Sequence, residues 1–168
     1  MPTYRLARRS PLIALTLALY ACNSDPRGAS REYLRNGNEY LAKGKYKEAS
    51  LLYRRALQKH AKYAESGFQL GLVNDRLENL AEARKDFTRA MDLDPANTAA
   101  IVRLGDLDLL FSAADQSRNK ERLADLKELA QTLLRRDKKS YDGLRFSGEI
   151  ALIEKDLRAR SAVSKMRI

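Results

Sequence analysis

Apolar and polar residues follow one another along this chain with the spacing of amphipathic helices. Near the start of the pattern, Tyr33, Gly37 and Tyr40 are separated by four and three residues, which places them on one face of a helix. Gly44 and Pro95 interrupt the pattern where a helix is expected to end. A further apolar stripe predicts a long helix later in the chain: Leu123, Leu126, Ala130, Leu133 and Leu134. The pattern therefore predicts an all-α protein.

These helical segments repeat with a period of 34 residues. Three glycines, Gly37, Gly71 and Gly105, are separated by that period. The first two are each followed, at equal offsets, by a small, an aromatic and a second small residue: Ala49, Tyr53 and Ala56, then Ala83, Phe87 and Ala90. Small residues at these places let two helices approach closely. Each period therefore predicts a hairpin of two packed helices.

The period and its small and aromatic positions resemble the tetratricopeptide repeat. That resemblance implies an all-α fold in which helix-turn-helix hairpins stack into a right-handed superhelical array of about 3.5–4 repeats. We place the repeats at about residues 30–63, 64–97, 98–140 and 141–168. Together they form one domain over residues 30–168.

The third and fourth repeats depart from the pattern. The next glycine in an equivalent place after Gly105 is Gly148, nine residues later than the period requires. We expect the extra residues to lie between Ser112 and Arg122 and to lengthen the second helix of the third repeat. The second helix of the incomplete fourth repeat is expected to carry Ala159, Val163 and Met166. No capping helix follows, which leaves a frayed helix, a truncated array or a homo-oligomer contact through the C-terminal end as alternatives.

The first 21 residues have a different character. They contain arginines but no acidic residue, and they end in an apolar run from Leu12 to Ala21. This run is about half as long as a membrane-spanning helix, so a secretory leader is expected rather than a membrane span. The residues Leu19-Tyr20-Ala21-Cys22 resemble the cleavage motif of bacterial lipoproteins.

The lipoprotein resemblance implies a signal peptide over residues 1–21, lipidation (diacylglycerol and an acyl chain such as palmitate) at Cys22, and a tether over residues 22–29. It places the protein in the bacterial cell envelope as a lipid-anchored membrane protein. Asn23, rather than Asp, follows Cys22, which favours the periplasmic face of the outer membrane over the inner membrane. The alternatives are a short buried helix around Cys22, or a cytoplasmic adaptor whose N-terminus is not processed.

The chain contains more basic than acidic residues. Lys and Arg number 32 and Asp and Glu 22, which gives a net charge of +10. Such a charge favours acidic partners such as anionic lipid, glycan, acidic protein or nucleic acid. The basic residues are scattered in short runs, as on a solvated helix surface, and we expect no nucleic acid among the partners.

Residues suited to catalysis or metal binding are few. Cys22 is the only cysteine and His60 the only histidine, and His60 lies in a polar turn beside Lys59 and Lys62. No cluster of His, Cys and carboxylate residues has the spacing of metal ligands, and no glycine-rich loop precedes Lys-Ser or Lys-Thr. We therefore expect a protein that is not an enzyme and that uses no metal or cofactor.

A partner-binding site is expected on the concave face, which in the tetratricopeptide family is lined by the first helix of each repeat. Carried over to this chain, the resemblance implies these lining residues: Arg31, Leu34, Asn38 and Leu41; Glu65, Phe68, Leu72, Asp75 and Arg76; Val102, Asp106 and Leu109; and Arg145, Glu149 and Leu152 from the fourth repeat. Apolar groups mixed with both charges suit a protein or peptide segment. Leu34 stands where chaperone-binding members carry a lysine, so a carboxylate clamp is not expected. The alternative for Leu34, Phe68 and Val102 is packing between repeats.

The sequence thus predicts a non-catalytic, lipid-anchored scaffold for protein–protein interactions in the bacterial envelope. Ser24-Asp25-Pro26 and the stretch from Tyr40 to Ala49 resemble the tetratricopeptide lipoproteins of exopolysaccharide export and exosortase systems. A pilus or outer-membrane assembly lipoprotein is the alternative among binding proteins. Direct binding of anionic glycan or lipid by the basic surface is the alternative of another class.

Overall fold

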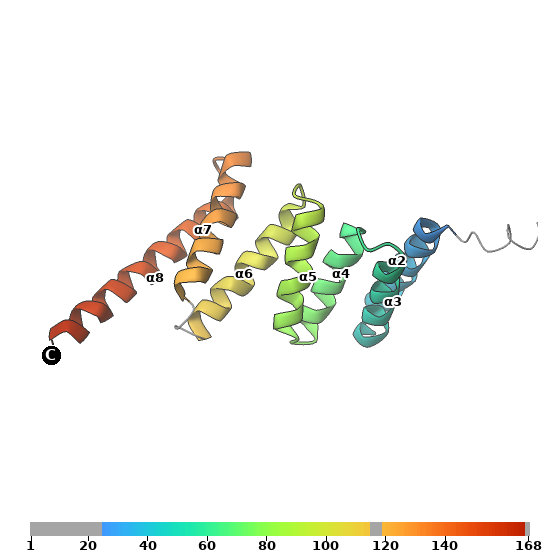
Figure 1. The fold of residues 1–168 in the computed structure, drawn as a ribbon, viewed down its shortest axis with the longest axis horizontal. Helices are drawn as coiled ribbons and strands as arrows, with labels where there is room; N and C mark the ends of the chain where they lie inside the picture. Colours follow the sequence, from blue (N-terminus) through green and yellow to red (C-terminus); the bar gives the residue numbers. More distant parts are fainter. Residues whose placement is uncertain (1–24, 115–118, 167–168) are drawn as a thin grey trace, which may run out of the picture.

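The computed structural model describes residues 25–114 and 119–166. Within these ranges the chain forms seven α-helices and no strand. Their bounds are α2 (Pro26–Ala42), α3 (Tyr46–Lys59), α4 (Ala64–Arg76), α5 (Leu80–Leu93), α6 (Thr98–Ala114), α7 (Asn119–Arg136) and α8 (Tyr141–Met166). Consecutive helices pack on one another from α2 to α8, so the molecule is an extended row of helices with α8 at one end (Figure 1).

The first helix starts earlier than expected. Pro26 and the residues up to Ala29 belong to α2, so the stretch predicted as a tether is helical over its last four residues. The Asp25 carboxylate caps the helix, because it accepts hydrogen bonds from the backbone N–H groups of Arg27 (3.0 Å) and Gly28 (2.9 Å). Pro26 at the first helical position adds to this start, since its missing N–H would have no partner there.

The turns inside the first two hairpins share one backbone feature. Gly44, between α2 and α3, has φ of +70°, and Glu78, between α4 and α5, has φ of +61°. These residues are one period apart, and glycine adopts this left-handed conformation without the steric cost that Glu78 bears. The third hairpin has no such turn at the next period, because α6 continues through Ser112 to Ala114.

The repeating glycines lie where an aromatic ring covers the helix backbone. A Cβ atom added at Gly37 would lie 2.5 Å from the ring of Tyr53, and one added at Gly71 would lie 2.6 Å from the ring of Phe87. We call this arrangement the glycine–ring contact. Tyr53 and Phe87 are fully buried, so the predicted close packing inside the first two hairpins is confirmed.

The third glycine uses a ring from a different helix. Gly105 in α6 is covered by Phe146, which comes from α8 rather than from α7. The residue that the period would place there is Glu121, which is exposed on α7. The α7 side of the third hairpin packs instead through a stripe of buried apolar residues, with Leu134 half-buried beside it: Leu123, Leu126, Leu129, Ala130 and Leu133.

The structure corrects two expectations for the C-terminal part. The second helix of the third hairpin is longer, as expected, but the first helix is longer too, since α6 and α7 have 17 and 18 residues against 13 and 14 for α4 and α5. The fourth repeat has no separate second helix, because α8 runs unbroken for 26 residues through Ala159 to Met166. Its last turns contain no Gly or Pro and are supported by ion pairs one turn apart, Arg158 with Glu154 and Arg160 with Asp156.

The buried apolar residues form two clusters. A smaller one lies in the first hairpin and against α4, around Tyr53, Leu57 and Val73. The larger one extends from α5 to α8 and includes Phe87, Ile101 and Phe146 as well as the α7 stripe. Over the described ranges, no helix is both long and apolar enough to cross a lipid bilayer.

Candidate partner-binding surfaces

Twelve of the fifteen residues predicted for the concave face, those from the first three repeats, lie on α2, α4 and α6, the first helices of the three hairpins. None of the twelve is buried. Their apolar members are half-buried, with Leu34 and Leu41 against the small cluster of the first hairpin. The others pack against the larger cluster: Phe68, Leu72, Val102 and Leu109. These residues thus contribute both to packing and to the accessible surface.

Three polar members of this set are already engaged within the chain: Glu65 accepts a hydrogen bond from Gln69 of its own helix, and the other two join different helices. Asn38 accepts a hydrogen bond of 2.7 Å from the hydroxyl of Tyr53. Burial, assisted by the nearby charge of Glu65, raises the pKa of that Tyr53 hydroxyl to about 12, so it remains a donor. Asp106 forms an ion pair of 2.6 Å with Arg145 of α8. Asn38 and Asp106 therefore hold helices together at the same time as they border the surface.

The residues expected from the fourth repeat separate into two groups. Arg145 turns toward α6 and pairs with Asp106, and its guanidinium also lies 3.1 Å from the Asp142 carboxylate. Glu149 and Leu152 face away from the other helices and are exposed. The structure therefore places Arg145 beside α6 but leaves Glu149 and Leu152 on an outer surface of α8.

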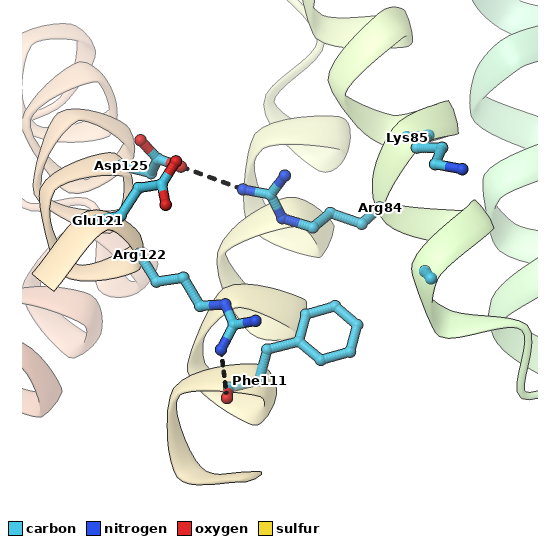
Figure 2. Close-up of a pocket in the computed structure, with 7 residues that line it drawn as sticks. Arg84, Lys85, Phe111, Glu121, Arg122 and Asp125 are labelled. Atoms are coloured by element: carbon cyan, nitrogen blue, oxygen red, sulfur yellow. Dashed lines mark hydrogen bonds and ion pairs between the residues drawn. The ribbon is translucent and has the colours of Figure 1, made fainter. Parts of the chain in front are cut away.

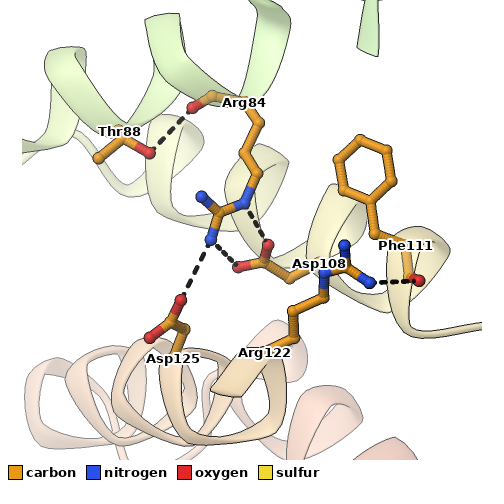
Figure 3. A network of polar contacts seen from close by, with 6 residues as sticks. All are labelled: Arg84, Thr88, Asp108, Phe111, Arg122 and Asp125. Carbon is orange, nitrogen blue, oxygen red and sulfur yellow. Dashed lines mark hydrogen bonds and ion pairs between the residues drawn. The ribbon is translucent and has the colours of Figure 1, made fainter. Parts of the chain in front are cut away.

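A polar site that the sequence analysis did not identify lies on α5, α6 and α7. Asp108 of α6 is fully buried, and its carboxylate accepts a 2.6 Å hydrogen bond from Nε of Arg84 of α5. The same guanidinium reaches the Asp125 carboxylate of α7 at 3.1 Å (Figure 3). One arginine thus connects three consecutive helices through two carboxylates.

The electrostatics of this network follow from burial. Desolvation raises the pKa of Asp108 even though Arg84 acts in the opposite direction. The hydrogen bond to Asp108 in turn raises the pKa of Arg84. A buried carboxylate without a cation would be costly, so the arginine is the partner that makes Asp108 tolerable inside the helix packing.

A shallow pocket opens beside this network. It is lined by residues of α5, α7 and the end of α6, as seen in Figure 2: Ala81, Arg84, Lys85, Phe111, Glu121, Arg122 and Asp125. Arg122 donates a 2.8 Å hydrogen bond to the Phe111 carbonyl oxygen, and its guanidinium lies 5.4 Å from the centre of the Phe111 ring. Because α5 and α7 are second helices of their hairpins, this pocket is not on the surface predicted for partner binding.

The sequence contains one signal for this network. Asp108 is an acidic residue within an apolar stretch from Leu107 to Phe111, where the helix is expected to be buried. A charge in such a place requires a partner of opposite sign. That partner, Arg84, lies 24 residues before Asp108, and the second carboxylate on Arg84, Asp125, lies 41 residues after the arginine, so no local pattern indicates them.

The described residues offer little for catalysis. His60 caps the end of α3, and its ring lies 5.8 Å from that of Tyr63. Within residues 25–114 and 119–166, no group of three or more His, Cys, Asp or Glu side chains is arranged to hold a metal ion. The leader, its Cys22 and residues 22–24 of the tether lie outside the described residues.

The second hairpin of this chain matches a known repeat family. A family model of the tetratricopeptide repeat matches residues 64–97, which contain α4 and α5. The "Protein CTR9 homolog" of Arabidopsis thaliana is 40% identical over 68 residues, which are 40% of this chain and 6% of that protein. This chain thus spans only a small part of that relative.

Solved structures share the arrangement of helices. The Hsp90 co-chaperone Cns1 of Saccharomyces cerevisiae is similar with a TM-score of 0.64 at 18% identity, over 86% of this chain and 45% of that one. The TPR2B domain of yeast Sti1 in its pHsp70 complex has a TM-score of 0.58 at 15% identity, over 76% and 98% of the two chains. The second TPR domain of human RPAP3, in complex with an HSP70 peptide, has a TM-score of 0.54 at 19% identity, over 77% and 95%. The predicted fold, an all-α superhelical array of tetratricopeptide hairpins, is confirmed.

Proposed function

We propose that this protein is a non-catalytic, lipid-anchored scaffold that binds a protein or peptide segment in the bacterial cell envelope. The array supports the scaffold part, since stacked hairpins present an extended surface made by their first helices. The observation that carries the proposal is that all twelve residues predicted for this surface keep accessible area on α2, α4 and α6.

The chemistry of this surface favours a peptide segment. Its apolar members, such as Leu72 and Val102, give an extended or helical peptide something to bury. Arg31 and Arg76 of one sign, with Glu65 and Asp75 of the other, can orient its polar groups. The similar TPR2B domain of yeast Sti1 is in a pHsp70 complex, and the second TPR domain of human RPAP3 is in complex with an HSP70 peptide. We propose the same surface here, with a different peptide, because Leu34 is unsuited to a carboxylate clamp.

Site-specific photo-cross-linking tests the surface. A photoreactive amino acid at Leu72 or Val102 should capture one and the same protein in the producing bacterium. The same probe at Leu51, an exposed leucine on the second helix of the first hairpin (53% accessible), is the matched control and should not capture it. Equal capture at all three positions, or no capture at Leu72 and Val102, would reject the groove.

The lipid anchor is tested separately. The mass of the mature N-terminus should show a chain that begins with a lipid-modified Cys22, and Cys22→Ala should abolish both cleavage and partitioning into detergent. An intact Met1 with a free thiol would show an unprocessed protein instead. That result would remove the envelope location while leaving the cross-linking result unaffected.

The role in an exopolysaccharide export or exosortase system rests on the resemblance of the tether and of residues 40–49. A pilus or outer-membrane assembly lipoprotein is the alternative. The identity of the cross-linked protein separates them, because an export component supports the first role and a pilin or outer-membrane assembly factor supports the second.

A second candidate function is direct binding of an anionic glycan or lipid. One observation favours it: five basic residues of the first hairpin are exposed, namely Lys43, Lys45, Lys47, Arg54 and Arg55. Binding of this kind weakens steeply with salt, whereas binding in the apolar groove does not. Affinity for an acidic polysaccharide that is lost between low and physiological salt would favour this function.

A further inference from the structure

The last helix has two apolar faces. One face, with Gly143, Phe146 and Ile150, is buried against the rest of the array. The other face is outside. Its large apolar members are Tyr141, Leu144 and Leu152, which are 76%, 56% and 64% exposed. With about 100° per residue, these residues and Gly148 fall within one stripe along the helix. We call this the α8 stripe: Tyr141, Leu144, Gly148 and Leu152.

Gly148 within this stripe resembles the other repeat glycines but lacks their ring. An aromatic ring covers each of Gly37, Gly71 and Gly105. The ring lies so close to the backbone that a Cβ atom added at the glycine would clash with it. A Cβ atom added at Gly148 would meet no atom within 4 Å. Among the described residues, Gly148 is thus a repeat glycine whose glycine–ring contact is unfilled, and it belongs to α8, the helix at one end of the row (Figure 1).

We propose that a second copy of this chain covers the α8 stripe from Tyr141 to Gly148, and that Tyr141 of each copy fills the place over Gly148 of the other. Tyr141 lies seven residues, or about two turns, before Gly148 on the same face. If two α8 helices pack antiparallel about a two-fold axis between Leu144 and Arg145, Tyr141 of one copy stands opposite Gly148 of the other. The same contact then forms twice.

The charges near this axis are complementary in the same register. Exposed Glu149 of one copy stands opposite Ser140 of the other, next to exposed Lys138 and Lys139. Arg145 is close to the axis, but its charge is already balanced by Asp106 and Asp142 of its own chain. The pairing therefore brings opposite charges together at both ends without placing two unbalanced arginines in the middle.

A second copy fits this face better than an unrelated peptide because the face is self-complementary. An isologous interface needs a surface that carries both the projecting group and the site that receives it. The α8 stripe has both, and the dimer leaves the first-helix surface of α2 and α4 unoccupied. The inference is therefore independent of the proposed lipid anchor and peptide groove.

The first test measures the dimer directly. Sedimentation velocity of the full chain in detergent should show a monomer–dimer equilibrium. Gly148→Gln and Tyr141→Ser should each weaken dimerisation by tenfold or more, and circular dichroism should be unchanged because neither side chain is packed within the chain. Leu51→Ser is the control, since it removes another large exposed apolar side chain, from α3, and it should leave the dimer intact. A monomer at all concentrations, or a dimer that both α8 variants leave unchanged, would overturn the proposal.

The second test fixes the register. In a Cys22→Ser background, a chain with Tyr141→Cys and a separate chain with Gly148→Cys should form a mixed disulfide dimer when they are combined and gently oxidised. Each alone should cross-link poorly, because identical positions then lie about 10 Å apart along the helix. Leu152→Cys should not self-cross-link, since the two copies of residue 152 lie more than about 20 Å apart. Efficient self-cross-linking of Leu152→Cys, or no mixed disulfide, would contradict this pairing.

Discussion

The first two hairpins and the last three helices use the same glycine–ring contact at different distances along the chain. Tyr53 and Phe87 each lie 16 residues after their glycine, on the second helix of the same hairpin. Phe146 lies 41 residues after Gly105, on the helix that follows the hairpin. Each of the first two hairpins therefore carries its own closing ring, whereas α6 and α7 are completed by α8.

The first two hairpins and the C-terminal helices also differ in the contacts that hold their helices together. In the first two hairpins, a turn with a left-handed residue brings the helices into contact, as Gly44 and Glu78 show. In the C-terminal part, α6 continues beyond that point and polar groups connect the helices over longer distances. Arg84 joins Asp108 and Asp125, and Lys127 of α7 pairs with Glu154 of α8 at 2.5 Å. We infer that α6, α7 and α8 form one cooperative unit, tied to α5 through Arg84 and through the shared apolar cluster, whereas α2–α3 and α4–α5 each form a unit of their own.

The largest effect is expected where the long-range ring is removed. Phe146→Ala deletes a fully buried aromatic side chain and should lower the free energy of unfolding by about 3–5 kcal/mol. Glu121→Ala changes the residue that the 34-residue period would place over Gly105, and it should cost less than about 0.5 kcal/mol. Denaturant unfolding of both variants measures the difference. Equal losses would mean that α7 supplies the contact and that the two regions do not differ.

The second-largest effect is expected from the hydroxyl group of Tyr53, which the rings of Phe87 and Phe146 lack. Burial raises the pKa of Tyr53 to about 12, while the unfolded chain has an ordinary value near 10. The stability that this protonated hydroxyl contributes is fully present below pH 10. It is lost as the pH rises toward 12, because the unfolded chain releases the proton first. The loss should amount to about 2–3 kcal/mol.

Tyr53→Phe keeps the ring over Gly37 and removes the hydroxyl. At neutral pH the variant should be less stable by about 1 kcal/mol, because the hydrogen bond to Asn38 is gone. Between pH 10 and 12 the difference in stability should shrink and then change sign, since only the parent loses the contribution of about 2–3 kcal/mol, which exceeds the deficit of the variant at neutral pH. A constant difference over that interval would show that Tyr53 does not titrate in this way.

A third effect tests the close packing inside the second hairpin. Ala83→Leu adds a large side chain at a fully buried position of α5 and should cost about 1–3 kcal/mol. Lys85→Ala, on the exposed side of the same helix, should cost less than about 0.5 kcal/mol even though its ion pair with Glu82 is lost. Similar values for the two variants would mean that the assigned helix faces are wrong.

The smallest effect concerns the turns. Glu78→Gly should stabilise the chain by about 1 kcal/mol, because glycine adopts the φ of +61° without steric cost. Gly44→Ala, at the equivalent turn of the first hairpin, should destabilise it by a similar amount. Thermal unfolding of the pair measures both signs, and two changes of the same sign would contradict the comparison of these turns.

The parts of the fold that the sequence predicts correctly are those determined by short-range spacing. Gly37 with Tyr53 and Gly71 with Phe87 lie within one period, so the helices and their packing follow from local patterns. The pairing of Gly105 with Phe146 could not be found in this way, because α6 and α7 are longer than the helices of the first two hairpins and the ring comes from the next helix, so the period no longer applies. The unbroken α8 was missed because a repeat was expected to turn, although residues 149–162 contain no glycine or proline.

Local sequence patterns predicted the candidate surfaces only in part. The first-helix residues were assigned from repeat position alone, and the structure leaves all twelve accessible. The Arg84 network was not predicted, since its three residues come from three helices and meet only when the hairpins stack. The unfilled place over Gly148 likewise becomes visible only when the other three glycines are seen with their rings.

Native-state hydrogen exchange of Phe146→Ala, compared with Phe87→Ala, tests the central difference most directly. If α8 completes the third hairpin, Phe146→Ala should increase exchange in α6, α7 and α8 together while α2 and α3 keep their protection. Phe87→Ala should increase exchange chiefly in α4 and α5. Faster exchange confined to α8 in the Phe146→Ala protein, with α6 and α7 protected as before, would contradict the account.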